Sequence, residues 1–350
     1  MTAIVSAGEA PALLGAHRRR MLRWWLLGAS VLLLVIVVIA SLAIGTRAVA
    51  IDQVFDAILR PVTGNVDHLV VRDIRIPRTV IGVMAGAALA IVGAILQGVT
   101  RNPIADPGLL GINAGASLAV VVAISALGIT RPDAYIWFAF TGAAAAAVIV
   151  FVIGSSGRDG ATPVKLALTG AAVTAAVTPL ITLVLIGDLD TLNQYRFWSV
   201  GSLAGRELAT AGALWPFLLA GLILAALLGR RLNLLALGDD VARGLGERPV
   251  VTHVIAAVAI VVLAGTATAL AGPIALVGLV IPHVARRFTG PDYRWILAYC
   301  VVLGPILLVA ADIIGRVVVA PAELEAGIVV AFIGAPVLIA IVRRARLAGM

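Results

Sequence analysis

The polar residues that could do chemistry in this chain are few, and most lie within apolar stretches. Thr174, Thr178 and Thr182 recur every four residues, which places their hydroxyls on one face of a helix. A stripe of this kind can line a water-filled path. Threonines in membrane helices also donate to the carbonyl one turn earlier, and Pro179 frees backbone groups that need such help. The spacing alone leaves both interpretations open.

No set of residues in the sequence fits a catalytic or metal site. The apolar stretches hold no paired carboxylates, no Ser/His arrangement and no zinc-ligand spacing, and Cys300 is the only cysteine. His283 lies beside arginines at a predicted helix end, where a structural role is more typical than a proton relay. The motif GxxxxGK[ST], which binds ATP phosphates, is absent. We therefore expect no enzyme activity, cofactor or metal in this chain.

The composition indicates a membrane protein. Apolar residues make up 61% and charged residues 13% of the 350 residues, with a mean hydropathy of +1.10, whereas about a quarter of a soluble domain is charged. The net charge of +8 does not indicate nucleic-acid binding, because the arginines lie between apolar stretches instead of on one basic face.

Ten membrane spans are predicted from apolar stretches close to the ~20 residues that cross a bilayer. Residues 250–285 form an apolar run too long for one span, and Gly272-Pro273 predicts a break and a short additional span within it. The expected spans are residues 24–45, 79–99, 108–128, 134–154, 163–187, 211–229, 250–271, 273–287, 296–314 and 326–342. The predicted organisation is a tail of residues 1–23, a membrane domain of residues 24–342 and a tail of residues 343–350.

The arginines between the spans predict an orientation. Most basic residues fall in the connections on the same side as the N-terminus, so the positive-inside rule predicts that both termini are cytoplasmic. Between the first two spans, residues 51–59 carry apolar side chains at helical spacing, which predicts a short amphipathic helix on the outer surface.

The connection RRLNLLALGDDVARGLGERPV after the sixth span is too apolar for an ordinary solvated loop. Residues 233–237 can form one short helix that ends at Gly238, and Asp239 can cap a second helix that runs to Leu245 and Gly246. We predict that these two helices form a docking surface on the cytoplasmic face. The alternative is an amphipathic helix that lies on the membrane.

Residues 75–116 are the most informative segment of the chain. An apolar helix leads into a polar break, after which a second apolar helix begins. Asn102 precedes Pro103 and is driven out of the α region, while Asp106 can cap a helix whose first residue is Pro107. Gln97 lies within the first of these helices and needs a hydrogen-bond partner on another helix.

This segment closely resembles the signature of the permeases of ABC importers for iron-siderophores, haem and vitamin B12, the iron-chelate permease family. The resemblance continues, motif by motif, through the C-terminal half of the chain. The matching residues of the signature are Arg75, Pro77, Arg78, Gly86, Gly93, Gln97, Asn102, Pro103, Ala105, Asp106, Pro107, Gly111, Gly115 and Ala116.

The resemblance implies a type II importer permease, an all-α membrane protein of about ten helices in the cell's cytoplasmic membrane. It further implies a second permease subunit, either a copy or a related chain, ATPase subunits that bind ATP and Mg, and an extracytoplasmic substrate-binding protein. Ferric siderophore is the expected cargo, with haem and cobalamin as alternatives. The rival from another class is an ion-coupled secondary transporter, against which the lack of acidic residues in mid-span argues.

The resemblance also implies roles for particular residues. Arg75 and Arg316 would meet acidic residues of the binding protein, although arginines at span ends often only reach the interface, and Asp312 can pair with Arg316. The helix that starts near Thr162 and Pro163 would line the path, with an inner gate at its start. The residues expected to couple to the ATPase are Leu234, Leu235, Leu237, Gly238, Asp239, Ala242, Leu245 and Gly246.

Overall fold

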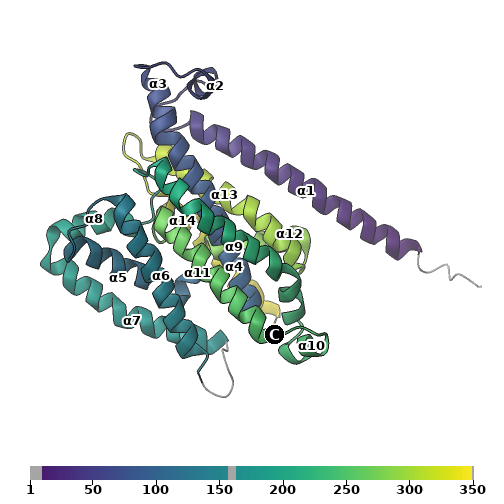
Figure 1. Cartoon of the computed structure of the whole chain (residues 1–350). Coiled ribbons are helices and arrows are strands. Elements are labelled where there is room, and N and C mark those ends of the chain that lie inside the picture. Colours follow the sequence, from purple (N-terminus) through teal and green to yellow (C-terminus); the bar gives the residue numbers. More distant parts are fainter. Residues whose placement is uncertain (1–9, 157–162, 349–350) are drawn as a thin grey trace, which may run out of the picture.

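The computed structural model describes residues 10–156 and 163–348, and every regular element in these ranges is a helix. Long helices lie side by side, and α1 runs along the edge of the bundle and projects beyond it (Figure 1). Among the described residues, seven helices are long and apolar enough to cross a membrane. They lie in α1 (Ala10–Ala43), α4 (Ile76–Thr100), α6 (Pro132–Gly154), α7 (Pro163–Gly187), α9 (Leu208–Leu235), α11 (Pro249–Ala271) and α13 (Tyr293–Val318).

The other three expected spans correspond to shorter or only partly apolar helices. These are α5 (Ile112–Ser125), α12 (Val277–Thr289) and α14 (Ala326–Ala348), whose apolar part ends at Ala340. The count of ten spans therefore stays a prediction. The amphipathic helix expected at residues 51–59 is confirmed as α2 (Ile51–Leu59), which buries Val54 and Ala57.

Short helices mark the two ends of the bundle. At one end, α2, α3 (Val66–Leu69) and the π-helical η1 (Val70–Arg75) connect α1 to α4, and we refer to it as the α2 end. At the other end, α10 (Asp239–Gly244) connects α9 to α11, and we refer to it as the α10 end (Figure 1). The helix α8 (Leu189–Ser199) follows α7 on the side away from α1.

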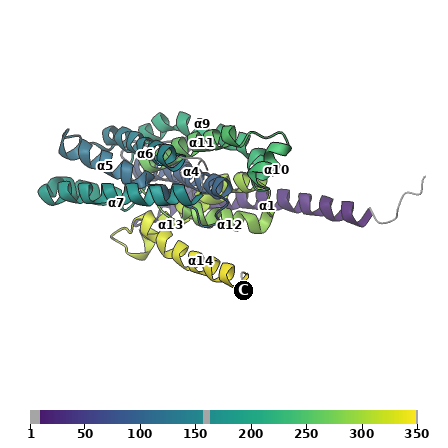
Figure 2. The same ribbon diagram turned by 90° about the horizontal axis from the view of Figure 1, so that it is seen from below.

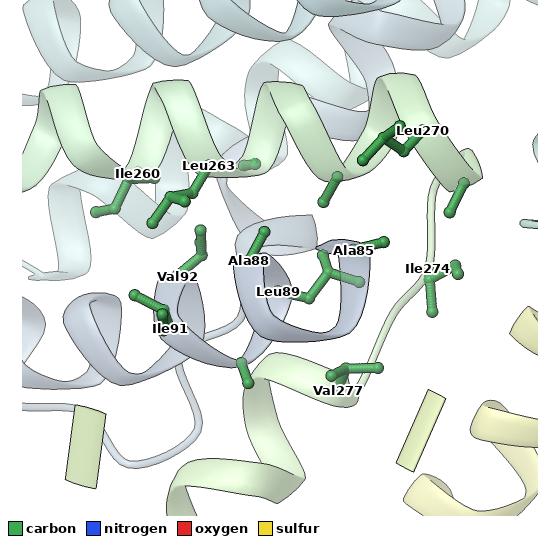
Figure 3. Packing of buried hydrophobic residues seen from close by; sticks show 14 of the residues in the cluster. Ala85, Ala88, Leu89, Ile91, Val92, Ile260, Leu263, Leu270, Ile274 and Val277 are labelled. Atoms are coloured by element: carbon green, nitrogen blue, oxygen red, sulfur yellow. The ribbon is translucent and has the colours of Figure 1, made fainter. Parts of the chain in front are cut away.

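Helix α4 is the centre of the bundle. It is buried along nearly its whole length and packs against α9, α11, α12 and α13. Figure 3 shows Ala88 and Val92 of α4 facing Leu263 of α11, while Val277 approaches α4 at the start of α12. The apolar core of the protein therefore surrounds one helix.

Glycines allow α4 to approach its neighbours at backbone distance. A Cβ atom added to Gly93 would lie 1.8 Å from the carbonyl oxygen of Gly278 in α12, and one added to Gly86 would lie 2.7 Å from that of Gly304 in α13. Because lipid tails are as apolar as side chains, close backbone packing instead of hydrophobic burial drives helix association in a bilayer. These contacts therefore bear directly on the stability of the bundle.

The polar break after α4 is confirmed, but its second half differs from the expectation. α4 ends at Thr100, and Arg101 adopts a left-handed conformation with φ of 48°. Asp106 accepts a hydrogen bond from the backbone N–H of Gly108, yet the turn it caps is the 3-10 helix η2 (Pro107–Leu110). The α-helix begins only at Ile112, because Gly111 has a φ of 68° and interrupts the helical path.

The break predicted at Gly272-Pro273 is also confirmed. α11 ends at Ala271, and Gly272 takes a φ of 75° that favours glycine. Helix α12 begins at Val277, four residues later than the predicted start of the short span, because the segment from Pro273 to Leu276 is not helical.

The sequence prediction for the connection between α9 and α11 is wrong in one respect. α9 continues to Leu235, so the separate short helix expected at residues 233–237 does not form. The reason is that Leu232 and Leu235 extend the buried stripe of α9 by another turn. Gly238 ends this turn with a φ of 105°, and Asp239 is the first residue of α10 instead of its cap.

We predict that Gly93→Ala destabilises the protein, because the new methyl group would overlap the backbone of α12. Overpacking of this kind costs about 1–3 kcal/mol, and the thermal unfolding midpoint in detergent should fall. The matched control is Gly212→Ala in α9, where an added Cβ atom meets nothing within 4 Å. A midpoint for Gly93→Ala equal to that of the control would contradict the packing argument.

Candidate functional site

The α9–α10–α11 connection presents an apolar surface at the α10 end. The side chains of Leu237, Val241 and Leu245 are 59%, 51% and 58% exposed, while Ala242 between them is fully buried. Leu234 and Leu235 belong to the base of the hairpin, where Leu235 is buried and Leu234 packs against the core. We call residues Leu234 to Gly246 the hairpin.

Arg101 fastens the hairpin to the end of α4. Its Nε donates to the carbonyl oxygen of Leu235 at 2.9 Å, and its guanidinium pairs with the carboxylate of Asp239. Both partners lie at the turn between α9 and α10. The left-handed residue that ends α4 therefore also fixes the hairpin.

A carboxylate fastens the other side of the hairpin. Glu247 accepts hydrogen bonds from Arg231 Nη1 at 2.9 Å and from Thr252 Oγ1 at 2.7 Å. Burial would raise the pKa of Glu247, but the hydrogen bonds from Thr252 and the backbone N–H of Arg248, together with the charge of Arg231, hold it below its usual value. Glu247 is thus kept ionised beside the guanidinium of Arg231.

Gln97 has the partners on another helix that its position requires. Its Nε2 donates to the carbonyl oxygen of Gly278 at 3.1 Å, and its Oε1 accepts from Arg286 Nη1 at 2.6 Å. Arg286 Nη2 also donates to the hydroxyl of Tyr293 at 3.3 Å. Gln97 therefore joins α4 to α12 close to where Arg101 joins α4 to the hairpin.

The residues of the polar break have local roles. The side-chain oxygen of Asn102 accepts from the backbone N–H of Ile104 at 3.0 Å, which shapes the turn around Pro103. Asp106 is nearly buried, and one of its carboxylate oxygens has no partner in the described part of the chain. The ring nitrogen Nδ1 of His283 lies 2.8 Å from the carbonyl oxygen of Leu279 one turn earlier, as expected of a structural histidine.

The threonine stripe of α7 satisfies its hydroxyls within its own helix. Thr174, Thr178 and Thr182 donate to the carbonyl oxygens one turn earlier at 2.9, 2.7 and 3.0 Å. Thr178 and Thr182 nevertheless lie on an exposed face of α7. Pro163 is the first residue of α7, and Thr162 lies outside the described residues.

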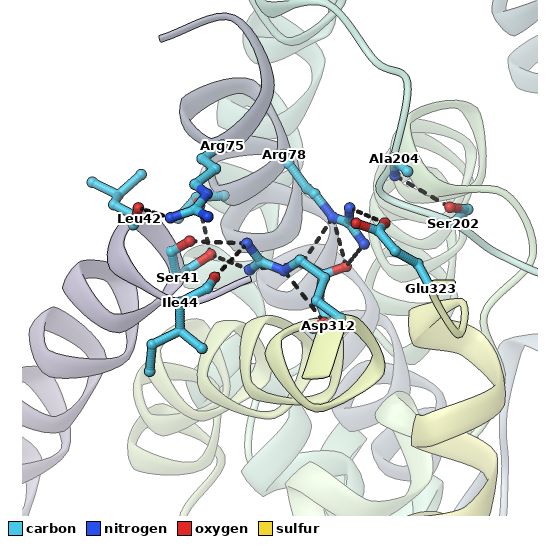
Figure 4. A network of polar contacts seen from close by, with 11 residues as sticks. Ser41, Leu42, Ile44, Arg75, Arg78, Ser202, Ala204, Asp312 and Glu323 are labelled. Carbon is cyan, nitrogen blue, oxygen red and sulfur yellow. Dashed lines mark hydrogen bonds and ion pairs between the residues drawn. The ribbon is translucent and has the colours of Figure 1, made fainter. Parts of the chain in front are cut away.

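At the α2 end, two buried arginines hold the C-terminus of α1 (Figure 4). Arg75 Nη1 donates to the carbonyl oxygen of Leu42 at 2.6 Å. Arg316 Nη1 donates to the carbonyl oxygens of Ser41 and Ile44 at 2.9 and 3.1 Å. Carbonyls at a helix C-terminus lack partners within the helix and carry partial negative charge, so two guanidinium groups there stabilise α1.

A second part of this network joins α4 to α13. Arg78 Nε lies 2.9 Å from each carboxylate oxygen of Asp312, which also pairs with Arg316 at 3.0 Å. Arg78 Nη1 donates to Glu323 at 2.6 Å, just before α14. The sequence indicated only the Asp312–Arg316 pair, and Arg78 was visible merely as a member of the RIPR motif.

The positions of Arg75 and Arg316 bear on their expected contact with a binding protein. Their residues are only 4% and 3% exposed, and their donors are directed at α1 and Asp312. In this arrangement, neither guanidinium lies on the outer surface of the chain. Substitution of either arginine would therefore affect a binding protein only indirectly, by changing the positions of α1 and α13.

Comparisons with known proteins agree with this arrangement. Residues 33–344 match the model of the FecCD transport family. The chain is 42% identical over 306 residues to the probable siderophore transport system permease protein YfiZ of Bacillus subtilis (strain 168), covering 87% of this chain and 91% of that protein.

Two further similarities concern an enterobacterial relative and a solved structure. The chain is 45% identical to the ferric enterobactin transport system permease protein FepD of Escherichia coli (strain K12), covering 87% of this chain and 90% of that protein. It is also similar to the solved structure of an inward-facing conformation of a putative metal-chelate type ABC transporter, with a TM-score of 0.79 and 25% identity, covering 91% of this chain and 99% of that chain. This multi-pass membrane permease therefore belongs to the FecCD transport family.

Proposed function

We propose that the chain is the permease subunit of an ATP-driven importer that carries ferric siderophores across the cytoplasmic membrane. The observation that carries this proposal is the exposed apolar hairpin at the α10 end of a FecCD-family bundle. A hairpin of apolar residues fastened to the central helix suits the transfer of motion from a separate ATPase. ATP and Mg are bound by that partner, because the sequence lacks a phosphate-binding motif.

In this proposal the α10 end faces the cytoplasm, and the chain makes ten spans with both termini inside. The excess of arginines in the connections at that end supports the orientation. Figure 1 is compatible with it, because the start of α1 and the end of α14 lie toward the α10 end, and Figure 2 shows α14 on the opposite side of the bundle from α9 and α11.

The transport path runs along α7 and is completed by a second permease subunit, either a copy of this chain or a related one. Leu183 and Ile186 of α7 and Phe332 of α14 support this, because they are 71%, 77% and 76% exposed in the single chain. The exposed Thr178 and Thr182 add polarity to the same helix. ATP binding would move the hairpin, and Arg101 and Gln97 would carry that motion to α4 and α12.

An extracytoplasmic substrate-binding protein docks at the α2 end. Because Arg75 and Arg316 are buried, we propose that they act by holding the ends of α1 and α13 in the shape that the binding protein recognises. Haem and cobalamin stay as alternative cargoes. An ion-coupled transporter is disfavoured, since the buried Asp312 is already neutralised by two arginines.

The proposed function is tested by uptake into vesicles that contain the permease with its ATPase and binding protein. We expect labelled ferric siderophore to accumulate only when ATP is supplied, whereas haem and cobalamin do not accumulate. Uptake of haem or cobalamin alone would assign the alternative cargo. Uptake driven by a sodium or proton gradient without ATP would refute the proposal.

We predict that the double substitution Leu237→Ser and Leu245→Ser uncouples transport. Both side chains are exposed, so the protein should still insert and fold, but its contact with the ATPase should weaken by about tenfold or more. The measurement is co-purification of the ATPase together with ATP-dependent uptake. The control is Leu59→Ser, which removes a leucine at the α2 end that is even more exposed than Leu237 and Leu245. Uptake equal to the wild type would exclude the coupling role.

We predict that Arg316→Gln lowers the thermal stability of the isolated permease, because it leaves carbonyls of α1 without their donor. Removing one partner of a buried ion pair costs about 3–5 kcal/mol, and the loss here should be smaller because Asp312 keeps Arg78. Arg47→Gln is the control, since Arg47 is 60% exposed in its pair with Asp67. Unchanged stability combined with lost capture of the binding protein would indicate direct contact instead.

A further inference from the structure

A cavity of about 320 Å³ opens at the α2 end, beside the arginine network that holds α1, and Arg78 and Glu323 of that network form part of its wall. Tyr135 of α6 and Trp198 of α8 form part of its wall, together with the connections that contain Ser202 to Arg206 and Glu323 to Glu325. Figure 4 shows one side of this region, where Ser202 and Ala204 lie near Glu323. Its volume equals that of about ten water molecules at ~30 Å³ each.

Arg206 is unusual among the residues that line this cavity, because it is a buried cation without an anionic partner among the described residues. The residue is only 9% exposed, and no carboxylate among the described residues forms an ion pair with it. Its Nη1 reaches the hydroxyl of Tyr135 at 3.4 Å, and its guanidinium lies 6.0 Å from the centre of that ring. Its Nε has no partner. Buried cations are normally paired with an anion, because desolvation is otherwise uncompensated.

Two neighbours of Arg206 in the cavity wall also lack partners. The indole Nε1 of Trp198, which is 2% exposed, and the Oε1 of Gln194 make no hydrogen bond in the described structure. Unsatisfied buried polar atoms are rare in native proteins, so three of them around one cavity point to a ligand that occupies it. Two of the three atoms are donors, which favours an acceptor as that ligand.

We propose that this cavity binds a carboxylate group of the transported chelate, with Arg206 and Trp198 as its donors. A carboxylate supplies two acceptor oxygens and the negative charge that Arg206 lacks. The volume far exceeds what one water molecule needs, so the rest of a small organic ligand fits beside the carboxylate.

The location ties the cavity to transport, and this step rests on the proposed function. Helix α8 follows α7 after Asp188, so the cavity lies at the outer end of the helix that we propose lines the path. A chelate that enters from the α2 end would meet Arg206 before it reaches Thr182 and Thr178. Glu323 is already bound to Arg78, which leaves Glu325 as the one lining carboxylate that could compete for Arg206.

The direct test follows the indole ¹⁵N–¹H signal of Trp198 in the full-length permease in lipid nanodiscs, assigned with Trp198→Phe. Iron-free citrate should shift this signal in a saturable way, while the signal of the exposed Trp215 stays in place. Arg206→Gln should weaken the citrate affinity by about tenfold or more, as expected for loss of a charged hydrogen-bond donor.

Control titrations of the Trp198 signal include outcomes that would overturn the proposal. An equal shift with chloride would indicate an adventitious ion only and would overturn the carboxylate assignment. No shift in the wild type would also overturn it, and a citrate response that appears only in Glu325→Gln would show that Glu325 itself occupies Arg206. Arg72→Gln, which changes an exposed arginine at the same end, should leave the citrate affinity unchanged.

A second measurement separates this site from the proposed function. In the complete transporter, Arg206→Gln should lower the uptake of ferric citrate relative to that of a ferric hydroxamate without free carboxylates, by about tenfold if the affinity loss is fully expressed. An unchanged ratio would remove the site from the transport route. If neither chelate is taken up by the wild type, the proposed function fails, while the citrate titration still decides whether the cavity binds carboxylates.

Discussion

The structure depends on the close backbone approach of α4 to α12 and α13. The contacts of Gly93 with Gly278 and of Gly86 with Gly304 leave no room for a side chain, and they lie in the middle of the bundle. A bilayer offers little hydrophobic force between helices, so association relies on this close packing and on a few polar contacts. Since α4 also packs against α9 and α11, its position sets those of four helices.

Helix α4 also connects the two ends of the bundle. At the α10 end, Gln97 and Arg101 attach it to α12 and to the hairpin, and at the α2 end Arg78 attaches it to Asp312 of α13. The contacts of Gln97 and Arg78 are buried, where polar interactions are strong, and removing one partner of the Arg78–Asp312 pair would leave a buried charge unpaired, whereas Arg101 pairs with Asp239 on the exposed surface. Attachment of α4 at both ends suits the proposed coupling to an ATPase.

The arginines of the α2 end divide into two classes by what neutralises them. Arg75 and Arg316 rest on the carbonyls of α1, and Arg78 and Arg316 share Asp312, so these charges are satisfied within the chain. Among the described residues, the guanidinium of Arg206 has only the hydroxyl and ring of Tyr135 as partners. The first class supports the structure, and the second carries the proposal that a ligand supplies the missing negative charge.

Local chemistry made part of this protein predictable from sequence. Proline and glycine limit backbone angles by themselves, so the breaks after α4 and α11 were predicted at the right positions, and the period of residues 51–59 predicted α2. Apolar runs of span length identified the seven long helices among the described residues. The extension of α9 to Leu235 was missed, because it follows from burial of Leu232 and Leu235 against neighbouring helices.

The sequence by itself determined the long apolar helices, the positions of two breaks and the motifs that indicate a transport permease, because each of these is a property of adjacent residues. Only the tertiary structure decided what the polar groups contact. Arg78 and Asp312 are 234 residues apart in the chain and form a buried ion pair. Arg75 and Arg316 are buried because α1 ends beside them, and Arg206 forms no ion pair with any carboxylate in the described part of the chain. The spacing of residues along a chain indicates the period of a helix, but it does not indicate which helices pack together. The free energy of a buried charge depends on the groups that this packing places beside it.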